Sequence, residues 1–137
     1  VAAVFPAAER LRRYAEQGTR LPLHAGPCRL LLAAAPASLQ ARVMALPLAR
    51  IGPATRTSRQ WLLAELGRLA SRDGLVTAEE LFEDAIEIAV PLRDAGGRAL
   101  AVVAVLSPAF RARPARRRAL LSSLQAAVAP LERLLGA

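Results

Sequence analysis

The sequence has no lysine, a single cysteine (Cys28) and a single histidine (His24). One cysteine cannot close an internal disulfide, and it cannot supply the ligands of a cysteine-rich zinc module. We therefore expect neither a disulfide framework nor a metal site, and no motif in the sequence indicates a cofactor. A lone thiol also fits a reducing compartment.

Long hydrophobic runs are missing as well. Uncharged runs such as Leu30–Ala41 and Ala99–Phe110 have 12 residues each, whereas a helix that spans a bilayer needs roughly 18 to 20. The apolar first residues are followed too soon by Glu9 and Arg10 to form the core of a signal peptide. These absences predict a cytoplasmic protein without a membrane partner.

The residues that are present suit one domain. The chain has 137 residues, of which 54% are hydrophobic, and this is enough to bury a single core. Arginine supplies all 19 basic charges against 11 acidic ones, so the net charge is +8. Seven of the 11 acidic residues lie between Asp73 and Asp94. They could face a basic patch on a partner subunit, but a solvated edge of the fold is the simpler interpretation.

The distribution of β-branched residues predicts a hairpin. Ala85–Leu92 and Arg98–Leu106 are rich in Ile and Val, and Asp94–Gly97 between them is a turn sequence able to supply positive φ. Strands joined in this way, rather than by strand–helix–strand units, are typical of an α+β domain with an antiparallel sheet.

Helical spacing of apolar residues predicts the other elements. Thr57, with Gln60 three residues later, forms a capping-box signature in front of a helix that starts near Trp61. The expected helices are Cys28–Ala35, Ser38–Leu46, Trp61–Arg72 and Pro114–Gly136, and short strands are expected at Val1–Phe5 and Arg10–Glu16.

Five arginines between Arg111 and Arg118 surround the start of the last expected helix. They could hold an acidic partner or a phosphate, but no aromatic residue lies between them, as platforms for single-stranded nucleic acid usually require. We expect a solvated or subunit-facing role. A stand-alone nucleic-acid binder is the weaker alternative, and it predicts salt-sensitive affinity for DNA.

His24 and Cys28 lie four residues apart. A small enzyme that uses them as base and nucleophile is an alternative function, but neither residue has an obvious partner to orient it. We expect His24 to make a structural hydrogen bond and Cys28 to act as a small apolar side chain. No catalysis is expected.

Several segments occur in an order that points to a known family. They are Gly18–Ala25, the helix Trp61–Arg72 with Thr55–Thr57 before it and Glu79–Glu80 after it, and Ile88–Arg98. Over nearly its whole length the chain resembles the effector-binding domain of isocitrate lyase regulator (IclR) type transcription factors. The resemblance implies a GAF-like fold for residues 1–137, in which helices flank a curved antiparallel sheet. It also implies a pocket for a small organic effector.

The same resemblance implies further partners. Members of the family bind operators through an N-terminal winged helix-turn-helix, and they act as dimers or dimers of dimers. That DNA-binding domain is absent from this chain, so we expect it to sense a ligand within a homodimer or tetramer. Contact with DNA is expected only through the missing domain.

The positions that match the family's ligand pocket are largely apolar here. Ala104 and Leu106 stand where serines can hold a carboxylate, Glu87 stands in place of a cysteine, and Pro27 lacks a backbone N–H. We therefore expect an effector larger or more apolar than a two- or three-carbon acid, for example an aromatic or apolar acid. Glu87 could instead select a cationic or hydroxyl-bearing ligand.

If an anion binds, its counter-charge is expected from Arg10, Arg13 or Arg29. The complete set of expected ligand-binding residues is Arg13, Leu21, Pro27, Cys28, Arg29, Thr77, Ile86, Glu87, Ala104 and Leu106.

Overall fold

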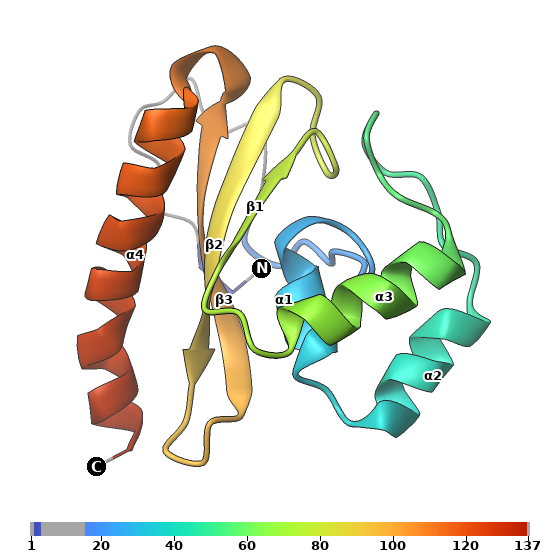
Figure 1. Cartoon of the computed structure of the whole chain (residues 1–137), viewed down its shortest axis with the longest axis horizontal. Coiled ribbons are helices and arrows are strands. Elements are labelled where there is room, and N and C mark those ends of the chain that lie inside the picture. Colours follow the sequence, from blue (N-terminus) through green and yellow to red (C-terminus); the bar gives the residue numbers. More distant parts are fainter. Residues whose placement is uncertain (1, 4–15, 137) are drawn as a thin grey trace.

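The computed structural model describes residues 2, 3 and 16–136 (Figure 1). The strands expected at Val1–Phe5 and Arg10–Glu16 lie almost wholly outside these residues, as does Arg13. These expectations stay predictions. For the described residues the fold is α+β, as the sequence predicts.

An antiparallel sheet of three strands lies at the centre of the described part of the chain. The strands are β1 (Leu75–Ala78), β2 (Ala85–Arg93) and β3 (Ala99–Pro108), in that spatial order. The turn between β2 and β3 is closed by Asp94, whose Oδ1 accepts hydrogen bonds from the backbone N–H groups of Gly96 and Arg98. The predicted hairpin is confirmed.

Helices cover both faces of this sheet (Figure 1). On one face lies α4 (Pro114–Leu135). On the other lie the short 3-10 helix η2 (Gly26–Cys28) and α1 (Arg29–Ala33), with α2 (Ala37–Ala45) and α3 (Arg59–Leu69) packed beyond them. A second short 3-10 helix, η3 (Ala109–Arg111), leads from β3 towards α4.

The predicted helices are confirmed, with corrections at the two ends of α3. The helix ends at Leu69 rather than at Arg72. The cap is Ser58 rather than Thr57, because the Ser58 hydroxyl accepts from the backbone N–H of Trp61 at 3.2 Å. The capping-box signature therefore located the helix and placed its cap one residue too early.

Strand β2 is buried on both faces, since layers pack against each side of it. Ile86 and Ile88 pack with Leu120 and Leu121 of α4. Ala89, on the opposite face, packs with Leu30 and Leu69 from the helical layer. Alternate β2 residues therefore belong to different layers, and this alternation decides which side chains can meet in a site.

Candidate functional site

Three residues from three strands form a row across the sheet, on the face that η2 and α1 cover. Glu87 in the middle of β2 lies opposite Thr77 of β1 and opposite Leu106 of β3. Directly paired residues of antiparallel strands point to the same face. Three of the expected ligand-binding residues are thereby brought together, although they lie up to 29 positions apart in the chain.

Glu87 is the ionisable member of this row. Its side chain is only 2% exposed. Its Oε2 accepts a 2.6 Å hydrogen bond from the Thr77 hydroxyl, whereas its Oε1 has no donor among the described residues. Burial raises the pKa of Glu87 to about 6, and Glu80 adds to the rise, while the Thr77 bond and the charge of Arg29 oppose it.

The 3-10 helix η2 places Cys28 above this face. Gly26 begins the turn with φ of +53°, and a Cβ at this position would lie 2.8 Å from the side chain of Leu81. Cys28 is partly exposed and forms no disulfide. Burial raises the pKa of its thiol, and the negative charge of Glu87 acts in the same direction. The thiol therefore stays protonated at neutral pH, which disfavours the nucleophilic role.

Arg29, the next residue, is buried in an ion-pair network. Its guanidinium makes a bidentate contact with Glu80, and the second bond, from Nη2 to Oε1, is 3.0 Å long. Glu65 of α3 approaches Nη2 at 3.8 Å, and the guanidinium lies over the Trp61 ring at 5.0 Å. Two carboxylates thus balance the charge of Arg29, so it adds no net positive charge for an anionic effector.

Glu80 also fixes the chain around the site. Its Oε2 accepts a 2.8 Å hydrogen bond from the backbone N–H of Gly26. Its backbone carbonyl accepts from the Thr55 hydroxyl at 2.5 Å and from the backbone N–H of Gly52 at 3.0 Å. Glu80 therefore ties η2 and the loop before α3 to the loop that joins β1 and β2.

His24 makes the structural contact expected of it. The side chain is buried, and its Nε2 donates a 2.8 Å hydrogen bond to the backbone carbonyl of Ala49. This bond holds the segment before η2 against the loop after α2. With His24 engaged in this way and Cys28 protonated, the geometry gives no support to a base–nucleophile pair.

The other expected ligand-binding residues divide between the two faces. Ala104 of β3 is exposed and lies on the same face as Leu106, two positions away. Pro27 is buried within η2, and Leu21 is half-buried ahead of it. Ile86 packs against α4, on the opposite face from Glu87.

One feature of the site was missed by sequence reasoning: Glu80 is buried, although the solvated-edge interpretation of the acidic segment predicts that it is exposed. Glu87, also buried, is one of the expected ligand-binding residues. The available signal was Arg29, which begins an otherwise apolar helix and needs a carboxylate partner once it is buried.

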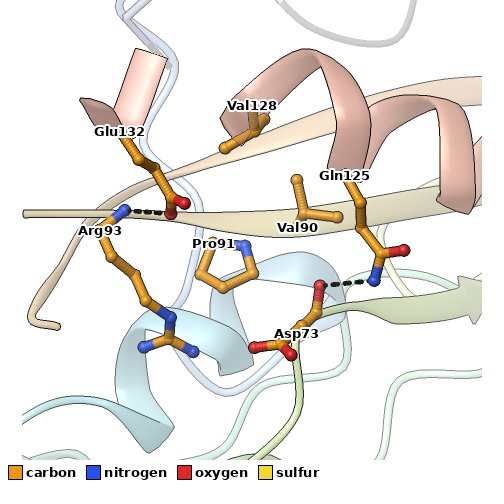
Figure 2. Close-up of a pocket in the computed structure, with 7 residues that line it drawn as sticks. All are labelled: Asp73, Val90, Pro91, Arg93, Gln125, Val128 and Glu132. Carbon is orange, nitrogen blue, oxygen red and sulfur yellow. Dashed lines mark hydrogen bonds between the residues drawn. The ribbon is translucent and has the colours of Figure 1, made fainter. Parts of the chain in front are cut away.

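A pocket of about 360 Å³ lies on the other face of the sheet, between β2 and α4. Figure 2 shows that its polar groups pair with one another: Arg93 donates its backbone N–H to Glu132, and Gln125 donates to the backbone carbonyl of Asp73. None of the expected ligand-binding residues lines this pocket.

The arginine cluster lies at the surface. Arg113 occupies the N-cap position of α4 without a side-chain capping hydrogen bond and is exposed. Arg111 stacks on the exposed ring of Phe110 at 5.4 Å. Within the described residues no group of three His, Cys, Asp or Glu side chains converges to hold a metal ion. No helix in that part of the chain is both long and apolar enough to cross a bilayer.

Comparison with known proteins agrees with this architecture. The sequence model of the family described as bacterial transcriptional regulator IclR C-terminal matches residues 1–133. The chain belongs to this family. The IclR resemblance stated from its motifs is thereby confirmed, and the arrangement of helices and sheet is that of solved IclR C-terminal domains.

Individual IclR relatives are moderately similar. The probable transcriptional regulator SauR of Cupriavidus necator is 37% identical over 103 residues, which cover 74% of this chain and 41% of SauR. This chain therefore spans less than half the length of that curated relative.

Two solved relatives contain bound aromatic acids. One is a double mutant of the PobR inducer-binding domain from Acinetobacter, in complex with 3-hydroxybenzoic acid. It is 28% identical to this chain with a TM-score of 0.79, and the match covers 87% of this chain and 70% of the PobR domain. The other is an IclR homologue from Microbacterium hydrocarbonoxydans, in complex with 4-hydroxybenzoate. It is 26% identical to this chain with a TM-score of 0.74, and the match covers 88% of this chain and 50% of the homologue.

Proposed function

We propose that this chain is the effector-sensing domain of an IclR-type regulator, and that a small organic effector binds on the sheet face below η2. The observation that carries the proposal is the row formed by Thr77, Glu87 and Leu106, where a buried carboxylate oxygen has no donor among the described residues. Buried polar groups are nearly always paired, so this oxygen calls for a partner, and in this proposal the effector supplies it.

The surroundings of this row support an effector with substantial apolar area. Leu106 and Ala104 present only hydrocarbon to this face, and Pro27 of η2 has no N–H to donate. Burial of an unpaired ligand carboxylate beside these residues costs several kcal/mol. An aromatic or apolar molecule is therefore favoured over a two- or three-carbon acid. The complexes of the PobR domain and of the Microbacterium homologue with hydroxybenzoates support the same class.

Sensing would act on the longer regulator by a population shift. An effector that binds one arrangement of the domain more tightly than another raises the population of the first arrangement. The size of this shift is set by the difference between the two affinities. Contacts from η2, the β1–β2 loop and α3 meet at the Arg29–Glu80 pair: Glu80 accepts from Gly26 of η2, and Arg29 reaches Glu65 of α3. The pair therefore links the effector face to the helical layer. In this proposal the cytoplasmic regulator acts as a homodimer or tetramer and contacts DNA through a domain outside this chain.

Blocking the face tests the proposal. Ala104→Trp places a large side chain on the exposed part of the face beside Glu87, and it should abolish the thermal stabilisation that an aromatic effector produces. Leu100→Trp is the matched control, because Leu100 is exposed on the same strand but at the end remote from the row.

Differential scanning fluorimetry with a panel of aromatic acids, short keto acids and sugars supplies the readout. Stabilisation of the wild type and the control, but not of Ala104→Trp, is the expected result. Equal stabilisation of all three proteins would place the ligand elsewhere. If no compound stabilises the folded chain, the sensing proposal fails.

A further inference from the structure

The unpaired oxygen of Glu87 restricts the chemistry of the ligand that can bind beside it. A carboxylate can accept about four hydrogen bonds through its two oxygens. Glu87 receives one from Thr77 at Oε2, and its buried Oε1 receives none from the described residues. A buried acceptor left in this state is destabilising, so a ligand that brings a donor gains more than an ordinary hydrogen bond.

We infer that Glu87 is the specificity-determining residue of this face and that it selects an effector carrying a hydrogen-bond-donating group, a hydroxyl or an ammonium. This inference rests on the proposed function and adds the class of ligand to it. The family resemblance implies a cysteine at this position, so the preference is a property of this chain's own residue.

Among the described side chains around this row, the unpaired carboxylate oxygen belongs to Glu87. On the β3 side Leu106 and Ala104 carry neither donor nor acceptor. The nearby charged groups are Arg29 and Glu80, and they are paired with each other. Cys28 approaches from η2 as a neutral thiol, which is a weak donor. A ligand carboxylate at this point would face the carboxylate of Glu87, whereas a donor would meet its unused oxygen.

The inference predicts that binding is linked to protonation of Glu87. The charged form of Glu87 accepts the ligand's hydrogen bond, so binding lowers a pKa that lies at about 6 in the free protein. Affinity for a donor-bearing ligand should therefore be constant above pH 7 and should fall as the pH drops below about 6. The nearby Arg29–Glu80 pair and Cys28 are present in every variant compared below, so their contributions cancel.

Matched ligand pairs provide the test, measured by isothermal titration calorimetry with the full chain. The hydroxyl pair is 4-hydroxybenzoate and 4-methylbenzoate, and the ammonium pair is 4-(aminomethyl)benzoate and 4-ethylbenzoate. The donor-bearing member of at least one pair should bind wild type about tenfold more tightly, as expected for a hydrogen bond to a charged group. The pair that shows the advantage tells whether hydroxyl or ammonium is preferred.

Two variants assign the preference to Glu87. Glu87→Leu should lose the advantage of the donor-bearing ligand and still bind its apolar twin. Glu87→Gln keeps the size and the ability to pair with Thr77, and it should remove the fall in affinity below pH 6. This second variant keeps the test valid if the leucine variant does not fold.

The possible results test effector binding and the donor preference separately. If both members of each pair bind equally to wild type, the donor preference is refuted while effector binding stands. If the preference persists in both Glu87 variants, another residue provides it and the inference is likewise refuted. If none of the four ligands binds to folded wild-type protein, the proposed aromatic effector and this inference both fail.

Discussion

The Arg29 guanidinium contacts both carboxylate oxygens of Glu80, which lies 51 residues further along the chain. The pair is buried and joins the start of α1 to the loop between β1 and β2. Because Glu80 also accepts from the backbone of Gly26, the contact fixes η2 over the sheet face on which Glu87 lies.

Removal of the cation from this pair should be strongly destabilising. Arg29→Met keeps much of the apolar stem but leaves Glu80 buried without its cationic partner, and Glu65 keeps only its contact with Arg68. We expect a loss of about 3 to 5 kcal/mol in the free energy of unfolding at pH 7, measured by urea denaturation. Arg98→Met is the control, since the exposed Arg98–Asp94 pair should leave the midpoint nearly unchanged. Similar effects of the two substitutions would contradict the structural role of Arg29.

Glu87 should make stability depend on pH in an unusual direction. Its pKa in the folded protein is about 6, above the ordinary value of 4.5, so between these values the folded state binds more protons than the unfolded state. The contribution of Glu87 to the free energy of unfolding is therefore largest below about pH 4.5. It falls as the pH rises from 4.5 to 6 and is constant above about pH 6. The total loss is at most about 2 kcal/mol.

Comparison of wild type with Glu87→Gln isolates this contribution from those of other groups. The variant should gain stability relative to wild type as the pH rises from 4.5 to 6, in urea denaturation at closely spaced pH values. A constant difference between the two proteins across this window would show that the pKa of Glu87 is ordinary.

Thr77→Val should destabilise the domain through Glu87. Valine has nearly the shape of threonine but cannot donate the 2.6 Å hydrogen bond to the carboxylate. We expect a loss of about 1 to 3 kcal/mol at pH 7, together with a further rise in the pKa of Glu87, because this bond lowers it. The loss should be smaller at pH 5, where Glu87 is mostly protonated. Thr77→Ser keeps the hydroxyl and should behave nearly as wild type at both pH values.

Two glycine substitutions should change stability in opposite directions. A Cβ at Gly52 would lie 2.5 Å from the backbone oxygen of Glu79, and backbone atoms cannot move aside easily. Gly52→Ala should therefore lower the free energy of unfolding by about 1 to 3 kcal/mol.

Gly67 lies within α3 with nothing within 4 Å of its Cβ position. Gly67→Ala should therefore raise the free energy of unfolding by about 1 kcal/mol. Thermal melts of both variants check this, and a neutral Gly52→Ala would show that the loop is not tightly packed there.

Much of the architecture could be predicted from the sequence because its signals are local. The turn residues Asp94–Gly97 between two runs rich in Ile and Val predict the hairpin. Pro114 at the first turn and apolar residues at helical spacing predict α4. The cap of α3 was misplaced by one residue, because Thr57 and Ser58 are both good capping residues and only the backbone conformation decides between them.

The candidate site depended on relations that the sequence does not contain. The resemblance identified Thr77, Glu87 and Leu106, but the strand register places them in one row and places Ile86 on the opposite face. A shift of one residue in that register would exchange the two faces.

The sequence by itself therefore determined the family, the hairpin and the helices, since turn chemistry, capping and hydrophobic spacing act over a few residues. Only the tertiary structure decided which charges are buried. Glu80 is buried because Arg29, 51 positions away, neutralises it, and Glu87 is buried between two neighbouring strands and η2 with one oxygen unpaired. A charge can be buried only where folding brings partners to it, because burial of an unpaired charge is costly in free energy. No local pattern of residues encodes which partners will be near.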